Sequence, residues 1–128
     1  MQRRRLGRTD IHVSAVSLGT MTWGQQNSEA EGHRQMDYAL ERGVDFWDTA
    51  EMYSVPTRAE TYGRTEEIIG SWFAGSGKRD KVILATKAAG PDVTLPWVRG
   101  GKSRFDRAHL RAALEGSLRR LKTDYVDL

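Results

Sequence analysis

The sequence predicts an α/β fold built around a parallel sheet. Short apolar runs alternate with segments of helical periodicity, a pattern typical of right-handed β-α-β units. No Gly-x-Gly-x-x-Gly follows the first apolar run, so a doubly wound dinucleotide-binding sheet lacks its usual marker. We therefore expect residues 1–128 to be a single partial domain. It would be the N-terminal half of a (β/α)8 TIM barrel preceded by a small β-hairpin, because such barrels usually take about 250 residues.

The strands of this fold are predicted in chain order. Residues 6–13 predict the hairpin, because the turn-like cluster Gly7–Arg8–Thr9–Asp10 stands between two short extended runs. Strands of the sheet are then expected over 15–19, 44–47 and 82–86, and a fourth is expected to begin within 123–128. The run at 82–86 is of the continuous apolar kind found in parallel sheets.

Capping residues mark three predicted helices, over 28–42, 64–73 and 106–121. Ser28 and Glu31 have the Ser-x-x-Glu spacing of a capping box, and Gly43 is a C-terminal stop. Asp106 can cap the third helix. Residues at helical spacing are expected to pack inward: Met36, Ala39 and Leu40; Ile68, Ile69, Trp72 and Phe73; and Leu110, Leu114, Leu118 and Leu121.

Two long loops follow the second and third strands, at 54–62 and 88–105. The second has two prolines, and a structureless loop of its length is usually functional or mobile. Both loops begin at the carboxyl ends of strands, where the functional groups of β/α barrels gather.

Composition excludes several classes of function. The net charge is only +3, and no basic stripe with interleaved aromatic residues indicates nucleic-acid binding. The lack of cysteine excludes disulfides and thiolate metal sites. His12, His33 and His109 lack metal-ligand spacing with a carboxylate, so we expect no metal. With no apolar signal core and no apolar run of roughly 20 residues, we expect a cytoplasmic protein without a membrane partner.

Three chemically active side chains follow the predicted second and third strands. Asp48 and Lys87 come where these strands end, and Tyr53 lies in the loop after Asp48. A phenol titrates near 10 in isolation, which makes it a poor acid at neutral pH, and a cation within about 4–6 Å favours its release of a proton. Lys87 can supply that cation, and Asp48 can hold Lys87 in place. The three residues therefore predict an acid-catalysis set.

Other residues near the same strand ends have less specific patterns. Glu51 is expected to be a loop or ion-pair residue rather than a second acid. Gly19–Thr20–Met21 follows the first strand, where it either forms a simple turn or lets a flat ligand approach the backbone closely. Trp23 and Trp97 lie in loops of the same mouth and either wall an apolar substrate pocket or cover the rim.

Taken together, the motifs of this chain resemble the start of an aldo-keto reductase, over essentially all of its length. They are Leu6–Thr9 with Val13–Ser14, Leu18–Gly24, Asp45–Tyr53, Gly63–Gly70, Ala85–Lys87 and Leu114–Leu128. Many relatives have a glycine directly after the tyrosine, and here residues 54–62 intervene. That insertion, with Gln25–Ser28 earlier, is similar to the bacterial Tas-like branch of the family.

The resemblance implies NADPH-dependent reduction of a small carbonyl substrate, an aldehyde or ketone, to an alcohol. Asp48, Tyr53 and Lys87 would be the catalytic residues, with Tyr53 protonating the carbonyl oxygen. By the same resemblance, Gly19, Thr20, Met21 and Asp48 would bind the cofactor near its nicotinamide ribose. The family's fourth catalytic group, a histidine just beyond the fourth strand, would come after Leu128.

The alternative is a non-catalytic half-barrel, or a cofactor-sensing regulatory subunit that needs a partner chain. Because the histidine position and the later cofactor strands of the family lie beyond residue 128, we expect the isolated chain to be an inactive fragment. The edges of a half-barrel and its exposed interior would also favour self-association.

Overall fold

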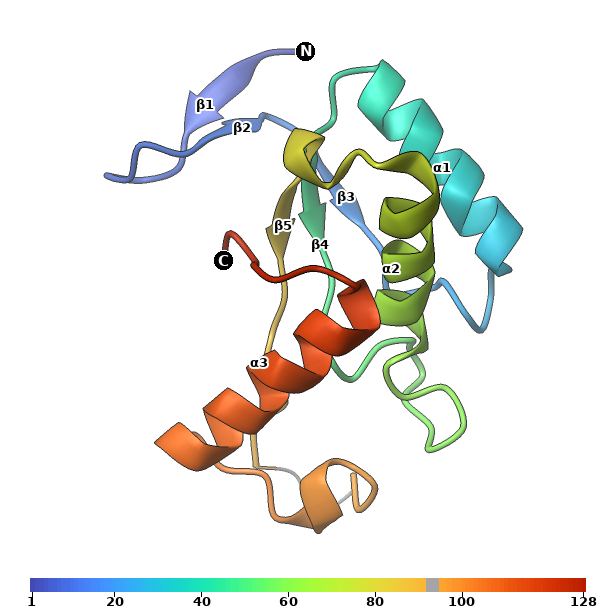
Figure 1. Cartoon of the computed structure of the whole chain (residues 1–128), viewed down its shortest axis with the longest axis vertical. Coiled ribbons are helices and arrows are strands. Elements are labelled where there is room, and N and C mark those ends of the chain that lie inside the picture. Colours follow the sequence, from blue (N-terminus) through green and yellow to red (C-terminus); the bar gives the residue numbers. More distant parts are fainter. Residues whose placement is uncertain (92–94) are drawn as a thin grey trace.

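A computed structural model describes residues 1–91 and 95–128, and it confirms the predicted alternation of strands and helices (Figure 1). A parallel sheet has the strand order β3-β4-β5, and an antiparallel hairpin, β1-β2, precedes it. The strands are β1 (Arg3–Arg5), β2 (His12–Ser14), β3 (Ser17–Gly19), β4 (Phe46–Asp48) and β5 (Ile83–Ala85). The helices are α1 (Glu29–Glu41), α2 (Arg64–Ser76) and α3 (Arg107–Leu121), with 3-10 turns η1 (Arg79–Lys81) and η2 (Arg99–Gly101). The α/β class is thus confirmed, and closure into a barrel stays a prediction.

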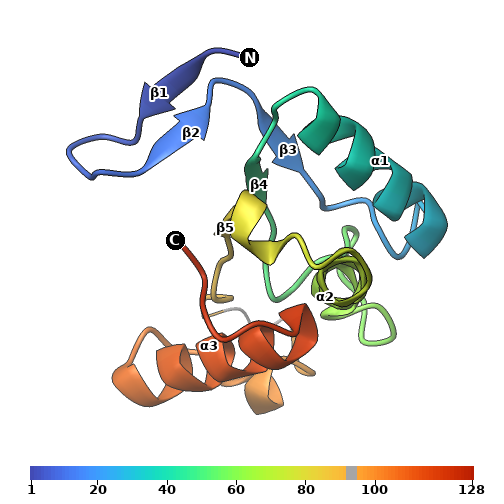
Figure 2. The ribbon, with the colours of Figure 1, turned by 45° about the horizontal axis from the view of Figure 1, so that its top comes forward.

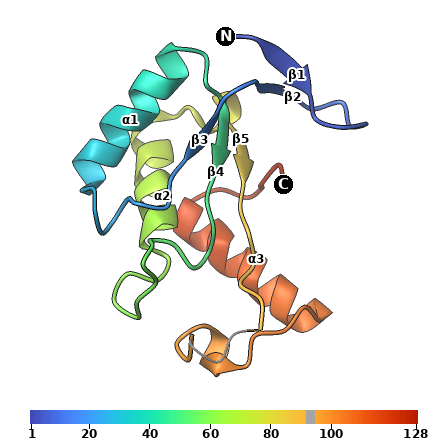
Figure 3. The ribbon, with the colours of Figure 1, turned by 180° about the vertical axis from the view of Figure 1, so that it is seen from behind.

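The register of the sheet places core residues on one face and the predicted site residue Asp48 on the other. Two neighbouring rows cross the strands: Leu18, Trp47 and Leu84, and then Gly19, Asp48 and Ala85. Successive residues of a strand point to opposite faces, so the two rows point in opposite directions. The first row packs in a core with residues from all three helices, which lie together on one side of the sheet in Figure 3. The second row lies on the face away from the helices.

The core is built around aromatic rings of β4 and α2. The four predicted residues of α2, from Ile68 to Phe73, are all buried, and Met36 of α1 and Leu121 of α3 complete the cluster. Trp47 stacks on Phe73, with ring centroids 6.2 Å apart and planes 6° from parallel, and it tilts against Trp72 at 5.1 Å. These contacts add to the burial of large apolar surface that holds the helices on the sheet.

The predicted leucine stripe of α3 is only partly correct. Leu121 is buried, but Leu110 and Leu114 remain 42% and 43% exposed. The buried residues of α3 include the small side chains Ala113, Gly116 and Ser117. α2 and α3 approach each other closely at Gly70, where an added Cβ would lie 2.1 Å from the carbonyl oxygen of Arg120. Small residues permit such backbone contact, and leucines at i, i+4 spacing do not reveal it.

The hairpin is tied to the amino-terminal end of the sheet through Asp45. The predicted hairpin is present, but its first strand, at 3–5, lies before the predicted range 6–13, and its strands flank residues 6–11. The Asp45 carboxylate forms an ion pair with Arg3 and accepts from the Ser14 backbone N–H at 3.0 Å. The Ser14 hydroxyl in turn accepts from the Asp45 N–H at 3.2 Å. Figure 2 shows the hairpin standing beside the start of β3, away from the strand ends that carry the predicted chemistry.

The predicted fourth strand is wrong as a regular element, because residues 123–128 are not assigned to a strand. They nevertheless run beside β5, where Asp127 N–H donates to the Leu84 carbonyl at 3.0 Å and Thr86 N–H donates to the Leu128 carbonyl at 3.0 Å. The Leu84 N–H donates to the Asp127 carboxylate at 2.8 Å. That side chain replaces the carbonyl that a regular ladder would supply, so the pairing stays incomplete.

The start and end of α1 are as predicted. Ser28 and Glu31 form a reciprocal capping box: the Glu31 N–H donates to the Ser28 hydroxyl at 3.3 Å, and the Ser28 N–H donates to the Glu31 carboxylate at 2.7 Å. Gly43 follows the last turn with a φ of 76°, a left-handed conformation that costs little only for glycine.

Within 1–91 and 95–128, each helix is too short or too polar to cross a bilayer.

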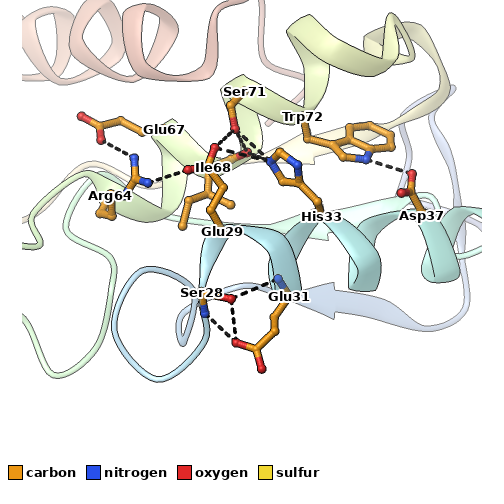
Figure 4. A network of polar contacts seen from close by, with 10 residues as sticks. All are labelled: Ser28, Glu29, Glu31, His33, Asp37, Arg64, Glu67, Ile68, Ser71 and Trp72. Carbon is orange, nitrogen blue, oxygen red and sulfur yellow. Dashed lines mark hydrogen bonds and ion pairs between the residues drawn. The ribbon is translucent and has the colours of Figure 1, made fainter.

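A polar network joins α1 to α2 (Figure 4). Glu29 binds Arg64 at 2.7 Å and also accepts from the Ser71 hydroxyl. His33 Nε2 lies 2.9 Å from the same hydroxyl, and Trp72 Nε1 donates to Asp37 at 3.0 Å. The Ser71 hydrogen bond, with help from Arg64 and His33, holds the pKa of Glu29 below its ordinary value of 4.5.

We expect Gly70→Ala to destabilise the fold by about 1–3 kcal/mol, because its methyl group would drive α3 away from α2. Gly75→Ala is the matched control in the same helix, since an added Cβ there meets nothing within 4 Å. That control should be neutral or stabilising, by up to about 1 kcal/mol, because alanine is the better helix former. Urea unfolding monitored by circular dichroism measures both; equal effects of the two substitutions would contradict the close approach.

The lowered pKa of Glu29 predicts a specific dependence of stability on pH. Because the folded-state pKa lies below the unfolded one, the contribution of Glu29 is present above about pH 4.5 and is lost as pH falls through the folded-state value. Glu29→Gln should therefore lower stability at neutral pH and flatten the loss of stability on acidification. Thermal unfolding from neutral to acidic pH tests this, with exposed Glu60→Gln as the control that leaves the profile unchanged.

Candidate active site at the carboxyl ends of the strands

Asp48 is placed by the last residue pair of β4. It stands in register between Gly19 of β3 and Ala85 of β5, on the face away from the helices. The two flanking residues carry no side chain and one methyl group, so the Asp48 carboxylate stands clear of its neighbours across the ladder. Its side chain is 43% exposed, which leaves it accessible from solvent.

Lys87 meets Asp48 from the next strand, as the sequence predicted. Its ammonium donates to the Asp48 carboxylate at 2.7 Å and to the Thr49 carbonyl at 2.7 Å. The Lys87 side chain is 47% exposed. Ion pairs this exposed contribute about 0–1 kcal/mol to stability. The pair therefore contributes little to the stability of the fold.

Tyr53 completes the predicted set from the loop after β4. The Lys87 ammonium nitrogen lies 4.9 Å from the centroid of the Tyr53 ring, within the range of cation–π attraction. A turn in which the Tyr53 N–H donates to the Ala50 carbonyl at 3.2 Å folds this loop back toward the strand ends. The structure thus brings together all three residues of the predicted acid-catalysis set.

The segment after β3 reaches the same rim, and its three residues differ in exposure. Gly19 is exposed, and an added Cβ there would meet nothing within 4 Å, so the space above its backbone is open. Met21 is 50% exposed. Thr20 is buried instead, and its hydroxyl donates to the Asp48 carbonyl at 2.9 Å. Gly19 and Met21 can therefore face a ligand, whereas Thr20 supports the backbone of Asp48.

Two hydroxyl groups beside the predicted set lack a hydrogen-bond partner among residues 1–91 and 95–128. They are Thr49 Oγ1 and Ser54 Oγ, in residues that are both fully buried. Buried polar atoms are normally paired, and unpaired ones in a native fold indicate either strain or an absent partner. Each directly follows a predicted site residue, Asp48 or Tyr53, in the chain.

Glu51 proves to be an ion-pair residue, as expected, but its partner was not foreseen. The carboxylate is 1% exposed and binds Arg99 of η2, in the loop after β5. It also accepts from the Ala89 N–H at 2.6 Å and from the Tyr62 hydroxyl at 3.4 Å. Burial is the main cause that raises the pKa of Tyr62 above its ordinary value of 10, and the negative charge of Glu51 raises it further. Arg99 lies in a Gly-rich stretch with no periodic pattern, so only the fold reveals the pair.

A second buried charge supports the strand that carries Lys87. Glu66 of α2 is fully buried, and its two oxygens have different partners. One accepts from the Thr86 hydroxyl at 2.6 Å, directly before Lys87, and the other accepts from Arg120 of α3 at 2.7 Å. Arg120 also lies over the Tyr62 ring, 5.4 Å from its centroid. The end of β5 is therefore fixed to two helices.

The two tryptophans considered for the pocket have different positions. Trp23 is fully buried in the main core, and its Nε1 donates to Gln35 at 2.8 Å, so it does not wall a pocket. Trp97 is half-buried and packs against a small cluster of Ala89, Leu95 and Val98, next to the loop that carries Tyr53. Only the second remains a candidate for a pocket wall.

Comparison with known proteins gives a consistent result. The model of the aldo/keto reductase family matches residues 15–128. Over 128 residues the chain is 47% identical to Protein tas of Escherichia coli (strain K12). It is 43% identical to the uncharacterized oxidoreductase YrpG of Bacillus subtilis (strain 168) over 130 aligned residues. The chain is covered completely in both alignments, and it spans 37% and 39% of the length of these relatives.

The fold is similar to solved structures of the same kind. The holo form of aldo-keto reductase AKR11C1 from Bacillus halodurans matches with a TM-score of 0.76 and 34% identity. That match covers 98% of this chain and 38% of AKR11C1. A putative aldo-keto reductase from Pseudomonas, PA4992, matches with a TM-score of 0.73 and 31% identity, over 97% of this chain and 44% of that one. The resemblance found in the sequence motifs, including that to the Tas-like branch, is confirmed.

Proposed function

The chain belongs to the aldo/keto reductase family, and from this premise we propose that it carries the proton-donating part of a carbonyl reductase. The reaction is the NADPH-dependent reduction of an aldehyde or ketone to an alcohol. The observation that carries this proposal is the Lys87 ammonium, which binds Asp48 at 2.7 Å and lies 4.9 Å from the Tyr53 ring centroid.

In this mechanism Tyr53 is the proton donor. The substrate carbonyl oxygen accepts a hydrogen bond from the Tyr53 hydroxyl, which gives up its proton as negative charge develops on that oxygen. The Lys87 charge favours the resulting phenolate, and Asp48 holds Lys87 in position through the ion pair. A nicotinamide cofactor, held near Gly19, Met21 and Asp48, would supply hydride for the carbonyl carbon. Each of the three side chains has a separate task, and none replaces another.

The cofactor proposal is supported by the open rim beside Asp48. Gly19 leaves space above the backbone, Met21 is half exposed, and Asp48 offers a carboxylate that can accept from a ribose hydroxyl. Thr20 contributes indirectly, through its hydrogen bond to the Asp48 carbonyl. The chain spans 37% of the length of Protein tas. The proposal therefore also includes three properties of the whole protein: the preference for NADPH over NADH, the carbonyl substrate and the closed (β/α)8 barrel.

Replacement of the phenol tests the assignment of the acid. We would join residues 1–128 of this chain to the remaining part of AKR11C1 and follow NADPH absorbance with para-nitrobenzaldehyde. Tyr53→Phe should lower kcat by about 10²-fold or more, because it removes the proton donor and keeps the ring. Tyr38→Phe, on the exposed face of α1, is the control and should retain the parent rate.

The same assay separates the proposal from its alternative. Residues 1–128 alone are expected to give negligible turnover. A Tyr53→Phe chimera that reduces the aldehyde at nearly the parent rate would refute Tyr53 as the acid.

A non-catalytic half-barrel or cofactor-sensing subunit that needs a partner chain is the second candidate, and the outer edge of β3 is where a partner strand would pair. Among the described residues, β3 pairs only with β4, so its other edge is open. Val16 and Tyr38 beside it are 53% and 59% exposed. A hollow of about 640 Å³ lies between this edge and α1. Its lining is half apolar (Val16, Leu18, Tyr38, Ala39, Val44) and half polar or charged (Ser17, Glu31, Arg34, Gln35, Arg42). An open strand edge offers unpaired N–H and C=O groups to another chain.

We therefore expect the isolated chain to self-associate through the β3 edge. Val16→Lys should shift it toward the monomer, because a charged residue on an edge strand opposes strand pairing. Ala59→Lys makes the same change in charge at an exposed loop position and should have no effect. Light scattering coupled to size-exclusion chromatography measures the mass; a monomer at every concentration, unfolding in one sharp transition, would contradict the expectation.

A further inference from the structure

Glu51 is the point at which the two loops of the candidate site are joined. It lies between Asp48 and Tyr53 in the loop after β4, and its backbone N–H donates to the Lys87 carbonyl at 3.1 Å. Its buried carboxylate binds two groups of the loop after β5, the Arg99 guanidinium and the Ala89 N–H. One residue thus contacts both the Lys87 backbone and the loop that follows it.

Arg99 is held in this position against its own backbone preference. Its φ of 47° is left-handed, a conformation that is costly for a residue with a Cβ. Despite this cost the Arg99 side chain is well buried, with 13% exposed. Its Nη2 donates to the Ala89 carbonyl at 2.8 Å, and its Nη1 binds Glu51. Strained residues of this kind persist where the surroundings fix them, and they occur most often at functional sites.

Apolar packing joins the same two loops beside this ion pair. Ala89, Leu95 and Val98 of the loop after β5 form a buried cluster. Met52 and Tyr62 of the loop after β4 pack against it. Met52 directly precedes Tyr53 in the chain, so the position of the phenol depends on how the two loops meet.

The relative strength of two ion pairs decides which of them fixes the geometry. Asp48 and Lys87 are both nearly half exposed, and such pairs are weak and readily exchanged for water. Glu51 and Arg99 are 1% and 13% exposed, and removing one partner of a pair this buried leaves an uncompensated charge, which is strongly unfavourable. The buried pair is therefore the firmer constraint on how Tyr53 and Lys87 approach each other.

We propose that Glu51 and Arg99 are positioning residues, which hold the Tyr53 loop against the Lys87 loop and so set the distance between the phenol ring and the ammonium. The inference deepens the proposed function, on which it rests, by assigning residues that act through Tyr53 and Lys87 without touching the substrate. A substitution in the pair should move Lys87 relative to Tyr53 while the sheet and helices stay folded.

The test uses the 128-residue chain with its lysines ¹³C-labelled at the ε-methylene, which leaves the ammonium and its two hydrogen bonds unmodified. In the proposed geometry the Tyr53 ring shifts the ε-methylene resonance of Lys87. Lys87→Arg identifies that resonance, and Tyr53→Leu gives its position without the ring. Glu51→Gln and Arg99→Lys should each move the resonance toward the Tyr53→Leu position. Arg104→Lys is the matched control and should leave it in place, because Arg104 is 69% exposed in a surface pair.

Hydrogen exchange gives a second readout on the same variants. Glu51→Gln and Arg99→Lys should speed amide exchange in 88–91 and 95–105 by about tenfold or more, with the core amides unchanged. A Lys87 resonance that stays at its original position in both variants would overturn the proposal. Global unfolding of both variants, detected by circular dichroism, would overturn it as well, because the pair would then hold the whole fold. Neither readout depends on carbonyl reduction, so an error in the proposed function is detected separately by the Tyr53→Phe assay.

Discussion

The alternation of side chains along β4 is the constraint on which the rest of the structure depends. Phe46, Trp47 and Asp48 form a strand of three residues, and successive side chains leave it on opposite faces. Trp47 enters the aromatic core, and this fixes the face on which Asp48 must stand. A slip of one residue would bury the carboxylate among Trp72 and Phe73 and expose the indole. The packing of the core therefore determines the orientation of the site.

The strands of the sheet are too short to fix the loops of the site by themselves, and buried ion pairs provide additional contacts that hold these loops in place. Each strand of the parallel sheet has three residues, so few ladder hydrogen bonds fix the ends from which the loops leave. Glu66 secures the end of β5 through Thr86, and Arg120 neutralises it from α3. Glu51 joins the loop after β4 to the loop after β5 through its ion pair with Arg99. These carboxylates stand on the helix side and in the loops, away from the exposed pair of Asp48 and Lys87.

Local signals in the sequence predicted the elements and the exposed part of the site. The capping box of Ser28 and Glu31, the stop at Gly43 and the spacing of Asp48, Tyr53 and Lys87 depend on residues close in the chain or on the register of parallel strands. Both are readable from sequence, because hydrophobic periodicity fixes which strand ends meet.

Contacts between distant, non-periodic residues were not predictable. Arg99 is 48 residues from Glu51, and nothing in its Gly-rich surroundings indicates a buried partner. The Asp127 carboxylate accepts the Leu84 N–H in place of a ladder bond that the fourth strand predicted within 123–128 would make. The leucine spacing of α3 likewise did not indicate the close approach of α2 to that helix through the small residue Gly70. In each case tertiary packing overrides the local pattern.

The bare flanks of Asp48 determine what shape of molecule can lie over the sheet. Neighbouring strands are about 4.8 Å apart, so the strip from β3 to β5 is roughly 10 Å wide. Within the row, only the carboxylate and the Ala85 methyl group rise from that strip, because Gly19 has no side chain. Ala85 is buried, so the space that stays open beside the carboxylate lies over the backbone of Gly19. A leucine side chain at position 19 would fill that space.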